Sequence, residues 1–271
     1  MNLFGEIIKL LDAKMPRPDS YGWFHILFIA LSIAFGVFLC LKFKNPSEKT
    51  VRRIVLIITL VVIALEIYKQ FNYSFSFDGE KVNFDYQWYA FPFQFCSSPM
   101  YVGLMASIFK GRIHRAASAF LATFATFAGL AVMIYPNDVF INTIGINIQT
   151  MVCHGSMLSI GIFLLGSGYV RSNLKSLLSA VPIFSAFVVT AMILNEIAYV
   201  SGLLLTETFN MFFISPHCDP SLPVYSIVQG AVPYPWCLFI YIIGFSLAAG
   251  VIIGISALLH KIFEKKEAKT A

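Results

Sequence analysis

Seven apolar stretches, each close to the length needed to cross a bilayer, recur along the sequence and constrain the fold more than any other feature. A transmembrane helix needs about 20 consecutive, mostly apolar residues. Charged residues make up 12% of the chain and the mean hydropathy is +0.77, whereas soluble domains contain about 25% charged residues. We therefore predict an all-α polytopic membrane protein, a seven-transmembrane-helix bundle with spans at 22–41, 53–71, 90–109, 116–135, 149–169, 176–201 and 236–259.

The basic residues between the predicted spans indicate the orientation of the bundle, because cytoplasmic loops carry an excess of Lys and Arg. The loops on one side contain only Lys81. This pattern predicts an outside N-terminus, an inside C-terminus and a multi-pass protein of the plasma membrane. It also explains the net charge of +5 without nucleic acid as a partner. Most of the 19 Lys and Arg lie in the other loops and after the last span: Lys42, Lys44, Lys49, Arg52, Arg53, Lys110, Arg112, Arg115, Arg171, Lys175, Lys261, Lys265, Lys266 and Lys269.

The chain divides into an amphipathic segment at residues 1–20, a single seven-helix domain at residues 21–260 and a basic cytoplasmic tail at residues 261–271. The amphipathic segment is expected to lie flat in the outer interface. Residues 74–84 alternate around an Asp-Gly pair, which predicts a small exterior β-hairpin with a type I′ turn. The apolar segment 209–214 is too short to span, and it is predicted to be re-entrant or interfacial.

Strongly polar side chains gather near the outer ends of four predicted spans. Such residues are costly inside a membrane and are candidates for function. At about 1.5 Å rise per residue, Glu66, Cys96 and His154 each lie roughly 8–9 Å inside the outer boundary. This common depth predicts a polar site that opens to the outer leaflet. Its candidate residues are Glu66, Lys69, Gln94, Cys96, Gln149, His154, Asn195 and Glu196.

Each of these residues also has a purely structural interpretation. Glu66 and Lys69 are three residues apart on one helix face and can form a structural ion pair. An intramembrane histidine such as His154 often joins helices by hydrogen bonds, and a cysteine such as Cys96 often packs as a small hydrophobe.

Together, however, the residues supply all the parts of an acyl-transfer site. Cys96 is a candidate nucleophile, and His154, on another span at the same depth, is a candidate base. Glu66 or Glu196 can orient the imidazole. Three amides, those of Gln94, Gln149 and Asn195, are candidate donors to an oxyanion. We therefore expect Cys96 and His154 to face one cavity.

The chain resembles the bacterial YwaF-like integral membrane proteins and their eukaryotic relative, transmembrane protein 164. The resemblance covers most of the chain, and its carriers are the Glu66/Lys69 pair, the sequence PFQFC that ends at Cys96, and His154. It implies a cysteine-type lipid acyltransferase that moves fatty acyl chains between glycerophospholipids, with Cys96 and His154 matching the required Cys and His. A more distant group, the androgen-induced intramembrane lipid hydrolases, uses Thr and His.

Two functions therefore remain open, besides a third interpretation, a non-catalytic membrane partner in which the polar cluster is filled and closed. In the first, Cys96 attacks an acyl ester of a membrane lipid, and a lysolipid or water resolves the acyl-thioester, without a metal or a soluble cofactor. In the second, the chain is a proton-coupled transporter of a small solute or ion. A transporter would use Glu66, Lys69, Glu196 and His154 as a proton relay, with no role for Cys96.

Overall fold

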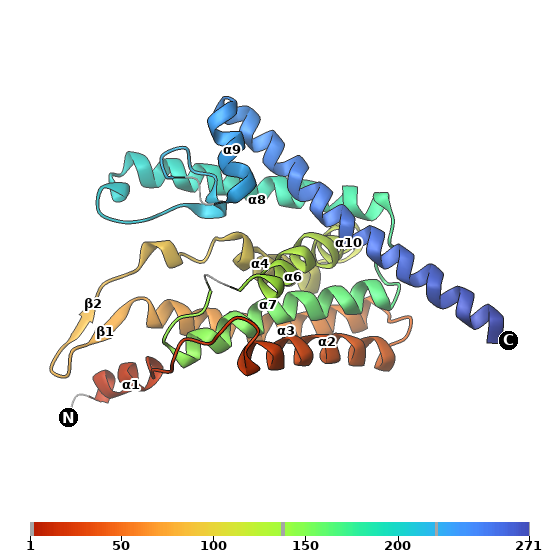
Figure 1. Cartoon of the computed structure of the whole chain (residues 1–271), viewed down its shortest axis with the longest axis horizontal. Coiled ribbons are helices and arrows are strands. Elements are labelled where there is room, and N and C mark those ends of the chain that lie inside the picture. The colour runs from red at the N-terminus through yellow and green to blue at the C-terminus, as the bar shows by residue number, and fades with distance from the viewer. Residues whose placement is uncertain (1–2, 137–138, 220–221, 271) are drawn as a thin grey trace.

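The chain forms an elongated bundle of helices with a small two-stranded sheet at one end, as seen in a computed structural model that describes residues 3–136, 139–219 and 222–270 (Figure 1). The elements follow in the order α1 (Leu3–Leu11), α2 (Trp23–Lys42), α3 (Glu48–Asn72), β1 (Phe75–Phe77), β2 (Val82–Phe84), η1 (Trp88–Ala90), η2 (Phe95–Ser97), α4 (Ser98–Ile108), α5 (Gly111–Phe120), η3 (Leu121–Ala125), α6 (Thr126–Ile134), α7 (Ile144–Gly166), α8 (Leu174–Val200), η4 (Leu203–Leu205), η5 (Met211–Phe213), α9 (Pro223–Ala231) and α10 (Tyr234–Thr270).

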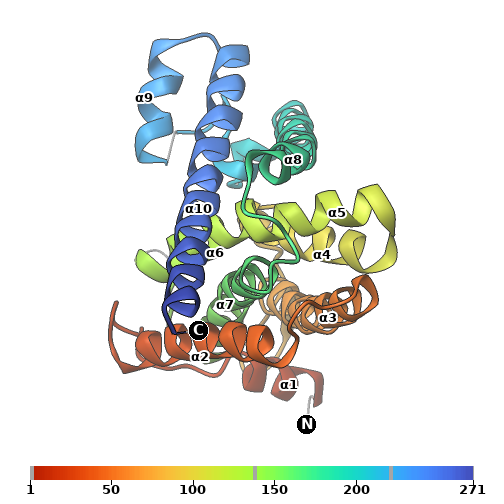
Figure 2. The same ribbon diagram turned by 90° about the vertical axis from the view of Figure 1, so that its right-hand side faces the viewer.

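Five of the described helices are long and apolar enough to cross a membrane: Trp23–Lys42, Gly111–Ile134, Ile144–Gly166, Leu174–Val200 and Tyr234–Lys265. This confirms an all-α membrane protein. The segments Gly111–Ile134 and Ile144–Gly166 lie at the centre, where 72% of the residues in an apolar stretch of 18 are buried. In the other three segments 22–28% of such a stretch is buried, so these helices expose apolar side chains around the bundle. Figure 2 shows α7 enclosed by its neighbours in a view along the long axis.

Small residues let α7 approach its neighbours closely. A Cβ on Gly155 would lie 2.2 Å from Ser32 Oγ of α2, and a Cβ on Gly161 would lie 1.9 Å from Thr126 Oγ1 of α6. Ser159 Oγ also donates to the Ser32 carbonyl across the α2–α7 contact. Such small-residue interfaces are typical of packed membrane helices, where backbone contact replaces the hydrophobic effect as the driving force.

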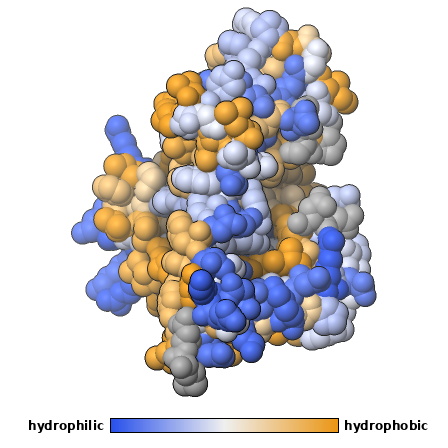
Figure 3. Space-filling view, turned by 90° about the vertical axis from the view of Figure 1, so that its left-hand side faces the viewer, coloured by the Kyte–Doolittle hydropathy of each residue, from blue (hydrophilic) through white to orange (hydrophobic). Residues whose placement is uncertain are grey.

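The two ends of the bundle differ, and we call them the hairpin end and the basic end. The hairpin end carries α1, β1 and β2, and Figure 3 shows it as a mixture of hydrophilic and hydrophobic surface. The basic end carries the connections α2–α3, α4–α5 and α7–α8 and the end of α10. At the hairpin end, α1 packs on β1 through Phe4 and Phe75, whose ring centroids are 5.6 Å apart.

The predicted hairpin is confirmed, but its turn is different. Phe75 pairs with Phe84 and Phe77 with Val82 in an antiparallel register. A type I′ turn needs positive φ at both central residues, and of the central residues Gly79 and Glu80 only the glycine has one, at 103°. The preceding Asp78 accepts the N–H groups of Lys81 and Glu80 with Oδ1, and these hydrogen bonds lower the pKa of its carboxyl group. The Asp-Gly pair therefore sits one residue earlier in the turn than expected.

The predicted helix at 90–109 is also different. The α-helix begins only at Ser98, and the chain before it is a 3-10 turn, Phe95–Ser97, preceded by extended residues. Phe91 has φ −48° and ψ 134° because the residue before a proline is driven out of the helical region. Pro92 thus keeps this part of the span out of the helix, and the carbonyl of Pro92 accepts the Tyr101 hydroxyl instead.

Candidate active site

The segment that contains Cys96 is an irregular strip held against the bundle by side-chain amides. Gln70 Nε2 donates to the Ala90 carbonyl at 2.8 Å. Gln94 Oε1 accepts the Phe212 N–H, and Gln94 Nε2 donates to the Asn210 carbonyl, both at 3.1 Å. Irregular backbone inside a membrane bundle needs such internal partners, because lipid offers none. The strip that contains Cys96 is therefore held by α3 on one side and by the loop 209–214 on the other.

Cys96 and His154 line one cavity of about 320 Å³ at the hairpin end of the bundle. Cys96 comes from η2 and His154 from α7, and the α3 side chains Glu66 and Lys69 line the same cavity. The remaining polar lining comes from Ser97, Gln149, Thr150, Cys153, Tyr73 and Tyr89. The structure therefore brings together most of the polar side chains that the sequence places at one depth.

His154 is fixed in the tautomer that a general base requires. Its Nδ1 lies 2.8 Å from the Thr150 carbonyl oxygen. Because a carbonyl can only accept, Nδ1 carries the proton and the lone pair of the neutral imidazole is on Nε2. Among the described residues His154 has no other hydrogen-bond partner, so neither Glu66 nor Glu196 orients it. A backbone carbonyl one helical turn away does so instead.

Glu66 belongs to a different network on the same wall. Its Oε1 lies 2.9 Å from Lys69 Nζ and accepts a hydrogen bond from Gln70 Nε2 at 2.7 Å. Tyr86 in turn donates to Gln70 Oε1 at 2.7 Å. The ion pair is largely buried, and its hydrogen bonds compensate for part of the cost of removing the carboxylate from water. Lys69 thus brings a positive charge to the cavity that contains Cys96.

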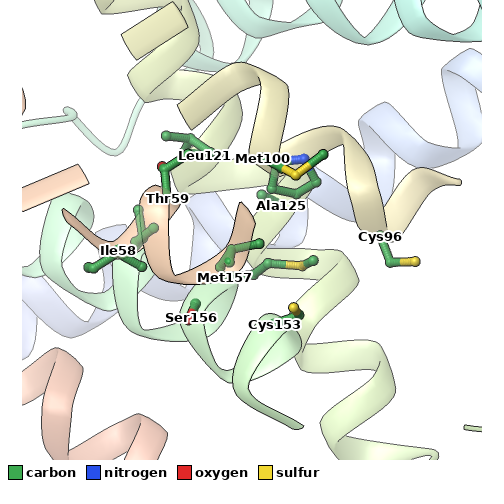
Figure 4. Close-up of a pocket in the computed structure, with 12 residues that line it drawn as sticks. Ile58, Thr59, Cys96, Met100, Leu121, Ala125, Cys153, Ser156 and Met157 are labelled. Carbon is green, nitrogen blue, oxygen red and sulfur yellow. The ribbon is translucent and has the colours of Figure 1, made fainter. Parts of the chain in front are cut away.

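Cys96 stands where this polar chamber meets a narrow, mainly apolar cleft of about 20 Å³. The cleft shares Val62, Cys96, Met100 and Cys153 with the chamber. Six of its eight other lining residues are apolar, among them Ile58, Leu121, Ala125 and Met157 in Figure 4, and the other two are Thr59 and Ser156. The side chain of Cys96 is exposed and lies in the first turn of the helical run, where aligned peptide dipoles stabilise a negative charge. Cys153, by contrast, is buried.

A π-helical turn shapes the cleft. Leu121–Ala125 interrupts the helix between α5 and α6, and both of its end residues line the cleft. Thr126 Oγ1 donates to the Leu121 carbonyl and satisfies a group that the wider turn releases from the regular pattern. Single π-turns inside α-helices are frequent at functional sites.

Three predicted site residues lie outside this cavity. Gln94 and Asn195 use both ends of their amides on the loop 209–214: Asn195 Oδ1 accepts the Met211 N–H at 2.7 Å, and Nδ2 donates to the Met211 carbonyl at 3.0 Å. Glu196 Oε1 pairs with His217 Nε2 at 3.0 Å near the surface. Depth along a helix does not determine which face a side chain occupies, which explains why Asn195 and Glu196 point elsewhere. Gln94 has an extended backbone in the irregular strip, where helical periodicity does not apply.

Two further residues that were not predicted from the sequence hold the site. Gln70 links Glu66 to the Cys96 strip, and Tyr241 donates to the Phe212 carbonyl at 3.0 Å. The signal for Gln70 is its position one turn after Glu66, which allows an i, i+4 contact. Among the described residues, no group of three or more His, Cys, Asp or Glu could hold a metal ion.

Comparison with known proteins identifies a family. The sequence matches the family model described as "TMEM164 family" over residues 20–255, which is most of the chain. No curated protein and no solved structure matches it. The matched range includes all the residues that line the Cys96 cavity.

Proposed function

Because the chain belongs to the TMEM164 family, we propose that it is a membrane-embedded lipid acyltransferase or lipid ester hydrolase that uses Cys96 as the nucleophile and His154 as the base. The observation that carries this proposal is the position of Cys96, between a polar chamber that contains His154 and an apolar cleft. The chamber has room for the carbonyl and head group of a lipid ester, whereas the cleft, at about 20 Å³, admits an acyl chain only if its side chains move aside.

In the first step the Cys96 thiol transfers its proton to Nε2 of His154, and the thiolate attacks the ester carbonyl carbon. Cys96 and His154 are not hydrogen-bonded to each other within the described residues, so one bridging water relays the proton, as general bases can do. The tetrahedral oxyanion collapses, the ester C–O bond breaks, and the lysolipid oxygen leaves with the proton from His154. An acyl-thioester remains on Cys96.

In the second step a hydroxyl group resolves the thioester. His154 Nε2 accepts its proton while the oxygen attacks the thioester carbonyl, the C–S bond breaks, and the proton returns to the Cys96 thiolate. A lysolipid hydroxyl gives transfer of the acyl chain, and water gives a free fatty acid. No metal or soluble cofactor takes part in this scheme.

Gln149 and Lys69 are the groups proposed to stabilise the oxyanion. Both line the chamber, whereas Gln94 and Asn195 have committed their amides to the loop 209–214. Gln149 Nε2 donates to Cys153 Sγ at 3.4 Å and Oε1 accepts the Thr150 hydroxyl at 3.4 Å; with no further partner among the described residues, the second N–H of Nε2 is available to a substrate. A preorganised donor of this kind contributes about 2.7–4 kcal/mol to transition-state stabilisation.

The apolar lining beyond Cys96 favours acyl chemistry over a proton-coupled transporter. A transport path needs polar side chains or water on both sides of the binding site, whereas the cleft beyond Cys96 is lined mainly by aliphatic and methionine side chains. Glu196, which a proton relay would use, is bound to His217 instead.

For the whole molecule we propose seven spans in the plasma membrane, with α3 and α4 completing the five long apolar helices, the hairpin end outside and the basic end in the cytoplasm. A reporter that is active only in the cytoplasm is expected to be active when fused at Ser47 and when fused at the C-terminus, because Lys and Arg concentrate at that end. A fusion in the hairpin at Gly79 provides the opposite control. Disagreement between the Ser47 and C-terminal fusions would contradict the span count.

The test of the enzymatic proposal uses the purified full chain in vesicles. The vesicles contain a phospholipid with an isotopically labelled acyl chain and an unlabelled lysophospholipid. We expect the label in a new phospholipid or in free fatty acid, together with an acyl adduct on the Cys96 peptide that hydroxylamine removes. Label that stays in the donor, without an adduct on Cys96, would refute the proposal. An adduct on Cys153 instead of Cys96 would refute the assignment of the nucleophile.

A further inference from the structure

A second and larger cavity lies at the basic end of the bundle, away from the Cys96 site. Its volume is about 710 Å³, and it is bounded by α5, by the beginning of α8 and by the α7–α8 connection. Figure 2 looks at this end, where the connection passes in front of α5 and leads into α8. None of the residues of the proposed acyl-transfer site lines it.

The charges around this cavity are almost all of one sign. Its lining includes Arg112 and Arg115 of α5, Arg171 of the connection and Lys175 of α8, and among the described residues Glu48 is the only acidic one that lines it. The four cations are exposed, and none makes a side-chain hydrogen bond or an ion pair within the described part of the chain.

The neighbouring Arg52 shows that basic side chains at this end can find internal partners. Its Nε donates to the Ser107 carbonyl at 2.7 Å and its Nη2 to the Ile108 carbonyl at 2.9 Å. Arg52 thus provides hydrogen-bond donors to two carbonyl groups at the C-terminal end of α4. The four cations of the cavity have no such structural task. A concave surface lined by uncommitted cations concentrates anions, because its walls focus the positive potential.

The inner wall of the cavity is polar, and its groups are hydrogen-bonded to one another. Tyr169 lines it, and its hydroxyl lies 2.6 Å from Nε2 of His114, which is buried and held to the Ala106 carbonyl through Nδ1 at 2.6 Å. Buried Ser118 and half-buried Ser176 add hydroxyl groups. The N-terminus of α8 also opens here, since Asn173 Oδ1 caps only the Ser176 N–H. Free N–H groups at a helix N-terminus favour a phosphate oxygen.

Exposed apolar side chains at the same level indicate that hydrocarbon begins next to the cavity. Ile113 on α5 is 45% exposed, and Leu174 and Leu178 on α8 are 65% and 58% exposed. The cations therefore stand at the height of a lipid head group. We propose that this cavity binds the phosphate of an anionic phospholipid from the leaflet at the basic end, as a site separate from the Cys96 chamber.

The experiment uses the full chain in detergent micelles and native mass spectrometry, with phosphatidylglycerol, phosphatidylcholine and free glycerol 3-phosphate as probes. The test variant is R112Q/R115Q/R171Q. The control variant K44Q/K49Q/R53Q removes the same charge from exposed residues at the same end, outside the cavity. Because each juxtamembrane cation contributes about fivefold to the binding of anionic lipid, the test variant is expected to lose on the order of 100-fold in phosphatidylglycerol affinity.

The expected result is a preference of the wild type for phosphatidylglycerol over phosphatidylcholine that the control retains and the test variant loses. The variant Ser179→Trp, which fills the cavity from an exposed lining position without changing charge, is expected to weaken binding as well. If free glycerol 3-phosphate displaced bound phosphatidylglycerol when both were present at the same concentration, the ligand would be a soluble phosphate and not a lipid. Equal losses in the test and control variants, or no preference between the lipids, would overturn the site itself.

Discussion

Replacing Cys96 by alanine is expected to lower acyl transfer and lipid ester hydrolysis by about 10³-fold or more, because the proposed covalent intermediate cannot form without the thiolate. Folding is expected to be retained. Cys96 is exposed at the wall of a cavity, so removing its sulfur leaves no enclosed void, and surface substitutions usually change the free energy of unfolding by less than about 0.5 kcal/mol. Release and transfer of labelled acyl chains in vesicles measure the first effect, and thermal unfolding in detergent measures the second.

Companion variants distinguish a catalytic thiolate from a cysteine that merely packs. Cys153→Ala is the matched control, since Cys153 lines the same cavities but is buried and lies next to His154 in the sequence, about 100° away around the helix. It is expected to keep most of the activity. Cys96→Ser is expected to be strongly impaired, because a hydroxyl is much harder to deprotonate than a thiol of pKa about 8.5.

His154→Ala is expected to be impaired to a similar degree, and the double variant with Cys96→Ala to be little worse than either single variant. Residues that act as one catalytic unit show such non-additivity. Full activity of Cys96→Ala would remove the enzymatic proposal. Losses of Cys96→Ala and His154→Ala that simply multiply would show that the two residues do not act in one step.

Much of this site could be predicted from the sequence, because the position of a residue along a membrane helix determines its depth in the bilayer. Glu66 and His154 lie on α-helices, where a rise of about 1.5 Å per residue gives their depth. Cys96 follows an irregular strip, so helical rise does not account for its level. The cost of polar groups in lipid then made these residues conspicuous. The cavity contains all three, together with Lys69 and Gln149.

Rotation about the helix axis and irregular backbone could not be predicted in the same way. Asn195 shares the depth of the site but faces Met211, since a difference of one or two residues turns a side chain by 100° or 200°. The strip before Ser98 is apolar enough for a helix, and only the effect of Pro92 on Phe91 indicates otherwise. The tautomer of His154 depends on the Thr150 carbonyl, a backbone group with no signature in the sequence.

The side-chain amides of Gln94 and Asn195 bind the loop 209–214 instead of lining the Cys96 cavity, and the backbone of this loop gives the reason. Phe212 is fully buried and packs against Phe93 and Phe95, with ring centroids 6.0 and 5.6 Å away. Its backbone has a φ of 58°, which is unfavourable for a bulky residue. The hydrogen bonds of Gln94, Asn195 and Tyr241 to this loop offset that cost, so the loop supports the strip that contains Cys96.

The second large effect is therefore expected from Asn195→Leu. The substitution conserves side-chain volume but leaves the N–H and C=O groups of the buried Met211 without their partners. Each unsatisfied buried group costs about 1–3 kcal/mol, so the loss in the free energy of unfolding is expected to be about 2–6 kcal/mol. Thermal unfolding and the rate of proteolysis within the loop measure it. Thr190→Val on the same helix is the control, because Thr190 is exposed and, among the described residues, its hydroxyl bonds only to the Ala186 carbonyl within the helix.

The same variant tests whether the loop positions Cys96. Gln94 holds the loop two residues before the proposed nucleophile, so loosening the loop from the Asn195 side is expected to lower the rate of Cys96 acylation while substrate binding changes little. A structural role without positioning would reduce the amount of folded protein but leave the acylation rate of the folded fraction unchanged. Asn195→Leu with wild-type stability and wild-type proteolysis would refute the proposed role of the loop, and a variant that is less stable but acylates at the normal rate would confine that role to folding.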